Sequence, residues 1–187
     1  KCPKGVLLFH YIDDIMLTSD SLADLKVAVP LLWQHLAACG WAINKSKVQQ
    51  PGLSARFLGV IWSGKTKAIP EAMIDKIQAY PWPTTVKKLQ IFVGLLGYQR
   101  AFVSFLAQMI KLLHWLTKKG APWDWDDAAE TAFLAAKQAI QPAQALQLVD
   151  KGCPFELDVH VTTDGFGWGL WQHVECLRMP VGFWSQL

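Results

Sequence analysis

Short apolar runs and turn signals alternate over the first part of the chain and predict a hairpin followed by a helix. Residues 5–10 and 15–18 are apolar runs of strand length, and we expect two buried strands joined as a β-hairpin with two aspartates at its tip. Residues 19–21 offer helix N-caps, and leucines then recur at helical spacing up to Gly40, a suitable residue just past a helix end. Because Pro30 interrupts this pattern, we expect the helix to bend or restart beside it.

The rest of the chain continues the alternation with longer helical segments. The pattern predicts a strand, a turn and a returning strand at 56–62, 63–66 and 67–69. Helical spacing predicts three helices, the first two introduced by Pro70 and Thr85, at 71–79, 85–97 and about 102–118. Residues 120–122 form the clearest boundary, and beyond them we expect one helix and two strands at 124–140, 155–160 and 167–172.

Composition narrows the class of protein. The chain has 187 residues, of which 52% are hydrophobic and 18% charged, so it can bury a sizeable core and is not disordered. It holds no run of 18 apolar residues, so we expect no transmembrane helix. It begins with neither an initiator Met nor a signal peptide, as expected of an excised piece. The cysteines lack metal-ligand spacing and suit reduced thiols of an intracellular protein: Cys2, Cys39, Cys153 and Cys176.

The net charge of +3 hides a strong asymmetry along the chain. Residues 40–119 carry twelve basic and two acidic side chains, a net of +10, whereas residues 1–39 and 120–187 have net charges of −1 and −6. A segment this basic suits a polyanionic partner, with nucleic acid first. An ordinary lysine-rich surface gives the same count, so the charge alone leaves both interpretations open.

The most specific local motif is Tyr11-Ile12-Asp13-Asp14 between two apolar strands. Two adjacent carboxylates cannot both be buried unpaired, so they must face solvent, basic side chains or divalent cations. Their hard oxygens suit Mg²⁺, and two such ions about 4 Å apart would support in-line phosphoryl transfer. A plain solvent-exposed Asp-Asp turn is the alternative.

This tetrapeptide resembles the Y-x-D-D motif of reverse transcriptases, and further matches follow along nearly the whole chain. Residues 40–47 are similar to the segment that closes the palm, and residues 57–60 to the F-L-G-[VY] of the primer grip. Residues 89–100 resemble the thumb helix of retroviral and retrotransposon polymerases, and residues 116–125 the junction of thumb and connection. The tail at 168–185 resembles the polymerase of spumavirus-related endogenous retroviruses of the ERV-L type.

The resemblance implies an α+β fold in three parts. The first part, at 1–70, is a partial palm of antiparallel hairpins plus a helix, and it carries the YIDD hairpin and the primer grip. A helical thumb follows at 71–118, and the RNase H-like start of a connection at 119–187. It also implies that the fingers and a third catalytic carboxylate lie upstream. Without them we expect this chain alone to be inactive as an RNA-directed DNA polymerase, because the Mg²⁺–triphosphate complex would not be held productively.

The resemblance also implies roles for individual residues. Asp13 and Asp14 match catalytic carboxylates that ligate Mg²⁺ in the full-length enzyme, although we expect no metal bound in the fragment, and Tyr11 matches the residue beside the primer terminus. The other candidates for primer–template contacts are Lys45, Lys47, Leu58, Gly59, Gln90, Gly94, Gly97 and Arg100.

Each of these candidates has a plainer alternative. The two lysines suit a solvated loop pair equally well, and Gly59 suits an ordinary strand bulge. The spacing of Gln90, Gly94, Gly97 and Arg100 places them on one side of a helix. Glycines there would either admit the minor groove of a nucleic acid or allow close packing of another helix. Asp158, His160 and Asp164 could be mistaken for a metal cluster, but we expect them to be structural. The ten tryptophans are expected to be mostly core and junction packing, although any could stack on a base.

The hypothesis that follows is that the chain is a fragment of a reverse transcriptase and keeps a surface that binds a primer–template. The parent enzyme would copy RNA into DNA by two-metal phosphoryl transfer. One alternative is a non-catalytic host-retained relic that acts as a protein-interaction module, because a truncated palm exposes apolar surface that a homodimer or another partner would cover. Another is a product without a selected function. Expected partners are an RNA/DNA primer–template and, only in a full-length enzyme, a dNTP. We expect no membrane association and an intracellular location, cytoplasmic or in virus-like particles.

Overall fold

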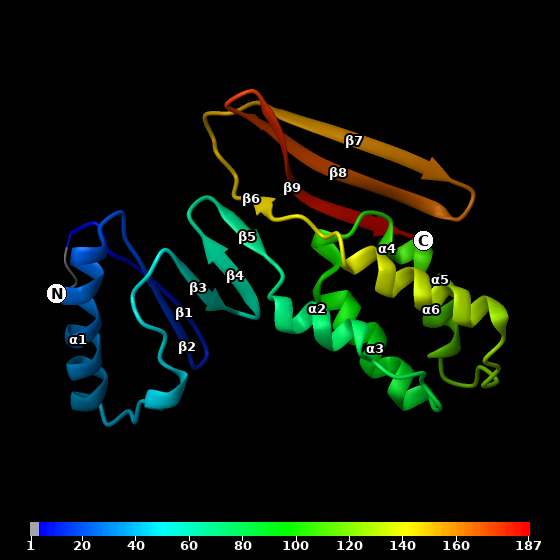
Figure 1. Ribbon diagram of the computed structural model, residues 1–187, viewed down its shortest axis with the longest axis horizontal. Coiled ribbons are helices and arrows are strands. Elements are labelled where there is room, and N and C mark those ends of the chain that lie inside the picture. The colour runs from blue at the N-terminus through cyan, green and yellow to red at the C-terminus, as the bar shows by residue number, and fades with distance from the viewer. Residues whose placement is uncertain (1–3) are drawn as a thin grey trace. The chain divides into compact units, whose positions relative to one another are not determined.

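The computed structural model describes residues 4–187, which form two compact units (Figure 1). The first unit ends at Gly64 and the second begins at Lys65. Antiparallel sheets combined with helices confirm the expected α+β class, while the three-part division at residues 70 and 118 stays a prediction.

The first unit opens with the expected β-hairpin. Strands β1 (Leu7–Tyr11) and β2 (Asp14–Thr18) pair antiparallel with Tyr11 opposite Asp14, which leaves a two-residue turn. The two aspartates therefore lie at the tip, as predicted. The expected burial of the first strand is wrong, because every residue of β1 is exposed. A two-stranded ribbon has two faces, and the single long helix of this unit cannot cover both.

Helix α1 (Leu22–Ala38) has the predicted caps at both ends. The Ser21 side chain accepts the Asp24 N–H, and after the helix Gly40 takes a φ of +82° while the Trp41 N–H donates to the Leu36 carbonyl at 2.9 Å. The predicted restart is wrong, because the helix continues through Pro30. Pro30 is exposed, so the carbonyl that loses its helical donor is left on a side open to water.

A second hairpin follows the short 3-10 helix η1 (Lys45–Lys47). Strands β3 (Ser54–Phe57) and β4 (Val60–Ser63) pair antiparallel, so the single strand predicted at 56–62 is wrong. A two-residue turn interrupts it at Leu58 and Gly59, whose φ angles are +50° and +68°. Positive φ at both central residues is the signature of a type I′ turn, which matches the twist of paired strands.

The second unit is built around packed helices. Its first elements, in chain order, are β5 (Thr66–Ala68), α2 (Glu71–Gln78), α3 (Val86–Tyr98), η2 (Arg100–Phe102), α4 (Leu106–Met109), α5 (Lys111–Leu116), α6 (Asp127–Ile140) and β6 (Leu146–Gln147). The predicted helices at 71–79, 85–97 and 124–140 are confirmed, with Thr85 and Asp126 as N-caps. The core lies where α3 meets α6, with the rings of Phe92 and Phe133 4.4 Å apart.

The third predicted helix, over 102–118, is broken into η2, α4 and α5. The break falls at Phe105, whose φ is +56°. Its ring packs so closely on Gly167 that a Cβ there would lie 2.8 Å from it, and it also contacts the ring of His160 edge-on. Helical spacing cannot reveal this, because the residues that hold Phe105 come from strands about sixty positions later in the sequence.

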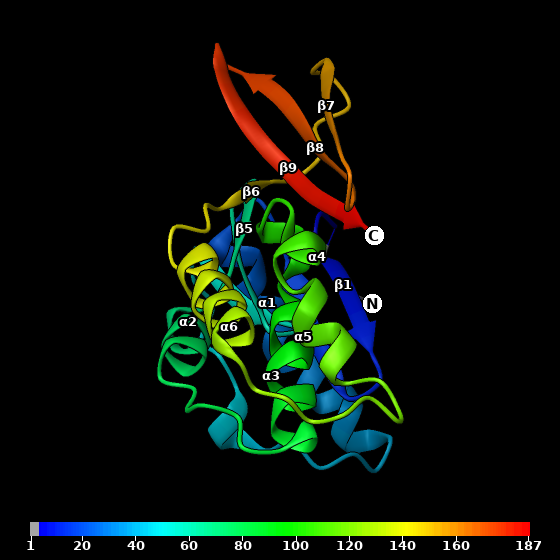
Figure 2. The same cartoon turned by 90° about the vertical axis from the view of Figure 1, so that its right-hand side faces the viewer.

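Those strands form a three-stranded antiparallel sheet of β7 (Phe155–Thr162), β8 (Gly165–Val174) and β9 (Leu177–Gln186). The sequence predicted parts of the first two and missed β9, where Pro180 and Gly182 are poor strand formers. Pro180 lies beside a register shift at Leu170 and Trp171, which accommodates it. The sheet is anchored to α4 because the Ser185 hydroxyl accepts the Ala107 N–H at 2.9 Å; both views show β9 running to α4 (Figures 1 and 2).

None of the helices in residues 4–187 is both long and apolar enough to span a bilayer. Three cysteines are free thiols, namely Cys39, Cys153 and Cys176. Cys2 lies outside the described residues.

Candidate nucleic-acid interface

The turn that carries the two aspartates has an unusual backbone. Ile12 and Asp13 are its central residues, and Ile12 has a φ of +54° whereas Asp13 does not have a positive φ. Positive φ at the first central residue alone fits a type II′ turn, which favours glycine there. A β-branched residue in this conformation is strained. His10 Nε2 donates to the Ile12 carbonyl at 2.6 Å, which helps to hold the turn.

The carboxylates at this turn are open to solvent. Asp13 and Asp14 are both exposed, and Tyr11 beside them is 57% exposed. Within residues 4–187, neither aspartate forms an ion pair, and no group of three or more His, Cys, Asp or Glu side chains could hold a metal ion. Carboxylate oxygens are the ligands that Mg²⁺ prefers, so the pair has the right chemistry for that ion.

Four of the candidates come together in one groove of the second unit. Gln90, Gly94 and Gly97 on α3 and Arg100 on η2 line a groove of about 680 Å³ whose other walls come from α4, α5, β8 and β9. All four are exposed, while Leu89, Phe92 and Leu96 of α3 are buried. The helix therefore has one face in the core and the opposite face along the groove, as the spacing predicted.

The two glycines of this groove face open space. A Cβ built on Gly94 or Gly97 would meet no atom within 4 Å. The alternative that these glycines serve close helix–helix packing is therefore wrong for the structure as described. What they provide instead is a strip of exposed helix backbone that a ligand can approach closely.

The sequence missed the far walls of the groove. His114 lines it from α5, and Trp168, Trp184 and Ser185 line it from the sheet. Gln90 reaches across, its Nε2 donating to the Thr117 carbonyl at 3.4 Å. No local pattern brings these residues together, because they belong to elements far apart in the sequence.

The candidates of the first unit lie on exposed turns. Lys45 and Lys47 are exposed on η1, and the Asn44 side chain caps that turn by accepting the Ser46 N–H at 3.1 Å. Both the solvated pair and a phosphate contact remain open for the lysines. Leu58 and Gly59 form the β3–β4 turn, so the alternative that Gly59 is a strand-bulge glycine is wrong. Its contact with a primer stays a prediction.

The three residues that could imitate a metal cluster are held in separate contacts. Asp164 pairs with Lys111 at 2.7 Å, His160 packs on the Phe105 ring, and Asp158 pairs with Arg178. Arg178 and His173 also donate hydrogen bonds to Glu156 and thereby hold its pKa below the ordinary value. These contacts support the structural interpretation of all three.

Sequence comparison identifies the family that the first unit resembles. Residues 1–62 match the family described as "Reverse transcriptase (RNA-dependent DNA polymerase)". The chain is 29% identical over 182 residues to the Gag-Pol polyprotein of Koala retrovirus and 28% identical over 181 residues to that of Woolly monkey sarcoma virus. In each case 97% of this chain is covered but only 11% of the polyprotein. The chain thus spans about a tenth of the length of the curated relatives it matches.

Structural comparison agrees over 96% of the chain. The structure of the foamy viral protease-reverse transcriptase dRH in complex with double-stranded DNA matches with a TM-score of 0.80 at 21% identity, covering 32% of that chain. The foamy viral protease-reverse transcriptase in complex with an RNA/DNA hybrid matches with a TM-score of 0.78 at 22% identity, covering 24% of that chain. The resemblance to reverse transcriptases is confirmed: residues 1–62 match that family, nearly the whole chain is similar in sequence to retroviral Gag-Pol polyproteins, and its fold matches that of the foamy viral protease-reverse transcriptase. The assignment of the chain to the ERV-L type stays a prediction.

Proposed function

We propose that this fragment binds a primer–template duplex through the groove beside α3. The observation that carries the proposal is the exposed glycine strip at Gly94 and Gly97, flanked by the polar side chains of Gln90 and Arg100. The net charge of +10 over residues 40–119 supports a polyanionic ligand. The solved relatives in complex with double-stranded DNA and with an RNA/DNA hybrid support the same ligand class.

The chemistry of the groove suits recognition of duplex shape rather than of sequence. A glycine strip allows the sugar edge of a minor groove to lie against helix backbone, and the wide minor groove of A-like duplexes presents hydroxyls to side chains such as Gln90. Arg100 supplies a planar cation for a phosphate. Lys87 lies one turn before Gln90 on the same helix side and is exposed, so it extends the basic surface along a backbone.

A binding assay with matched charge variants tests this proposal. Fluorescence anisotropy at about 50 mM salt should show sequence-independent binding of a labelled RNA/DNA hybrid, and the affinity should fall steeply as salt rises because counterions are released. Replacing Lys87, Lys88 and Arg100 with alanine should weaken binding and flatten the salt dependence. Lys151→Ala, an exposed charge change outside the groove, is the control and should change little. Absence of binding at low salt would refute the proposal.

The same interpretation assigns Asp13 and Asp14 as metal-ligating catalytic carboxylates of the longer enzyme, with Tyr11 beside the primer terminus. Their exposure at a strained turn supports this assignment. Since two carboxylates alone supply too few ligands, primer extension by this chain with Mg²⁺ should yield no product. Extension that disappears in Asp13→Asn would contradict that expectation.

Thermal denaturation tests the aspartate pair directly. Asp14→Asn should raise the stability by about 0.5 kcal/mol, because it relieves a like-charge contact without losing a ligand. Adding about 10 mM Mg²⁺ should leave the Tm of the wild type unchanged. A Tm that rises with Mg²⁺ in the wild type and not in the variant would show that the two aspartates hold a metal by themselves.

The alternative of a protein-interaction module is not favoured, because the comparisons match polymerases along nearly the whole chain.

A further inference from the structure

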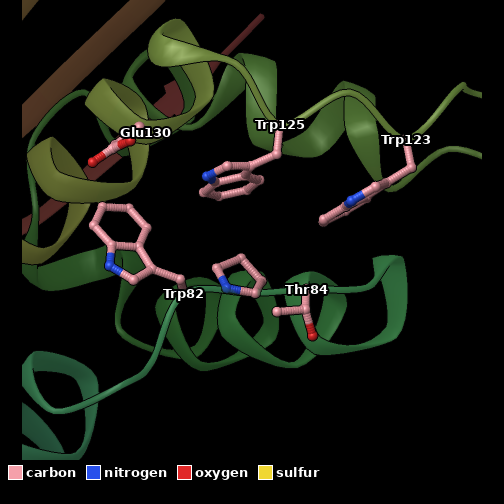
Figure 3. Close-up of a pocket in the computed structure, with 6 residues that line it drawn as sticks. Trp82, Thr84, Trp123, Trp125 and Glu130 are labelled. Carbon is pink, nitrogen blue, oxygen red and sulfur yellow. The ribbon is translucent and has the colours of Figure 1, made fainter.

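Three tryptophans from two separate segments converge at a second hollow of the second unit. Trp82 precedes α3, whereas Trp123 and Trp125 precede α6. The rings of Trp82 and Trp125 meet nearly at right angles, with centroids 6.3 Å apart and planes at 73°. Trp123 is nearly parallel to Trp125 at 5.8 Å. Figure 3 shows the three indoles around the hollow with the carboxylate of Glu130 at its edge.

The rings are held in place from behind but are not closed off from solvent. Trp82 packs on the core residue Phe133 at 4.9 Å, and Trp125 meets the same ring edge-on at 5.9 Å. Trp82 is nevertheless 43% exposed, and the hollow that the three rings help to line measures about 480 Å³. Core packing therefore explains one side of Trp82 and of Trp125, Trp123 rests on Trp125, and the three rings line the hollow in an arrangement that exists before a ligand binds.

The segment that carries Trp123 and Trp125 is negative, although the chain as a whole is positive. Residues 123–130 carry four carboxylates and no basic side chain. Glu130 lines the hollow from α6, is exposed, and forms no ion pair with any of residues 4–187. Lys88 does not line the hollow, and its ammonium donates to the hydroxyl of the lining residue Thr84 at 3.1 Å. A polyanion is thus disfavoured here, and a cation is favoured.

We propose that this hollow, formed by Trp82, Trp123, Trp125 and Glu130, binds a methylated organic ammonium ion. The faces of indole rings carry negative charge density and attract cations, most strongly when several faces surround one ion. A quaternary ammonium cannot donate hydrogen bonds, so aromatic faces replace its weak hydration, and the nearby carboxylate supplies the opposite charge. The ligand is either a free choline-like molecule or the side chain of a methylated lysine in a partner protein. The groove beside α3 shares no lining residue with this hollow, so either proposal can fail alone.

Titration followed by NMR tests the proposal. The full chain carrying nitrogen-labelled tryptophan would be titrated with choline, and the indole N–H signals of Trp82, Trp123 and Trp125 assigned by single Trp→Phe substitutions. Choline should shift these signals and saturate at millimolar concentration. Its neutral isostere, with tert-butyl in place of trimethylammonium, should bind at least about fivefold more weakly because only the charge differs. Equal shifts with both ligands would show a merely apolar hollow and overturn the proposal.

Two variants and a control separate the contributions. Glu130→Gln should weaken choline about fivefold while leaving the neutral isostere unchanged, because it removes one charge from an exposed helix position. Trp123→Leu should abolish saturable binding while keeping an apolar side chain. Glu71→Gln, an exposed carboxylate on α2, should bind as the wild type does. Wild-type affinity in Glu130→Gln would overturn the proposal.

The two sources of the ligand are then distinguished with a peptide. A peptide carrying trimethyllysine that binds at least tenfold more tightly than choline, and more tightly than its unmethylated form, identifies a protein side chain as the ligand. Equal affinity of the trimethyllysine peptide and choline identifies the free small molecule. Binding of neither ligand overturns the proposal.

Discussion

Substituting Gly94 separates the stability of α3 from its use as a binding surface. Gly94 is exposed in a helix interior, and a Cβ there meets no atom within 4 Å. Glycine at such a position costs about 0.8–1.0 kcal/mol relative to alanine, because it has more conformational freedom to lose on folding. Gly94→Ala should therefore raise the free energy of unfolding by about 1 kcal/mol, which corresponds to a Tm increase of roughly 2–4 °C for a chain of this size.

A larger side chain at the same position should have opposite effects on folding and on binding. Gly94→Leu keeps a strong helix former, so the fold should be at least as stable as the wild type. Its side chain would project into the groove where we place the duplex. A tenfold loss of affinity corresponds to about 1.4 kcal/mol, and we expect at least that loss. Ile91→Leu, at an exposed position of the same helix outside the groove, is the matched control.

Urea denaturation and hybrid binding would be measured on the same preparations. The expected pattern is a raised unfolding midpoint for Gly94→Ala, an intact fold with weakened binding for Gly94→Leu, and wild-type binding for Ile91→Leu. A destabilised Gly94→Ala would mean that a neighbour packs against the glycine. Unchanged affinity in a folded Gly94→Leu would refute the claim that the duplex lies along this strip.

Three further predictions concern strain, a buried amide and acid stability. Ile12→Gly should raise the stability measured by urea denaturation by about 1 kcal/mol, because it removes the strain of a β-branched residue in the left-handed region, whereas Ile12→Ala should not. Equal stability of the two variants would contradict the presence of strain. Gln99 is fully buried, and its side-chain amide has no hydrogen-bond partner within the described residues. Gln99→Met should therefore raise the Tm by an amount equivalent to about 1–2 kcal/mol. A lowered Tm would show that the amide is hydrogen-bonded. The pKa of Glu156 is held below its ordinary value by Arg178 and His173, so its contribution to stability is complete near neutral pH and is lost as the pH falls from about 4.3 through the lowered pKa. Glu156→Gln should therefore be less stable than the wild type at about pH 7, and the difference should shrink as the pH falls below the ordinary pKa of a glutamate. A difference that stays constant in acid would mean that a contact other than the charge is lost.

Local signals predicted the elements whose stability is decided within a few residues. The hairpin with Asp13 and Asp14 at its tip, the Ser21 cap and the Gly40 helix end follow from turn and capping chemistry, which the adjacent sequence encodes. The spacing of Gln90, Gly94 and Gly97 also predicted one shared face of α3, although Arg100 lies beyond the end of that helix, on η2. That prediction is confirmed because helical geometry alone determines it.

Features decided by distant contacts were not predictable in this way. The break at Phe105 depends on Gly167, and the open space at Gly94 depends on which helices happen to pack elsewhere. The strand β9 contains Pro180, which local propensity rejects but the register shift accommodates. The hollow at Trp82 and Trp125 joins two segments more than forty positions apart, and no local pattern links such distant residues into one site.

Site-specific photo-crosslinking tests most directly the claim that the α3 groove holds a duplex. A photoreactive phenylalanine derivative would replace Gln90 in the groove or Ile91 outside it, and each chain would be irradiated with a labelled RNA/DNA hybrid at low salt. The account predicts a strong crosslink from position 90 that unlabelled hybrid suppresses, and a much weaker one from position 91. Equal crosslinking from both positions, or none from position 90 while the hybrid is bound, would contradict it.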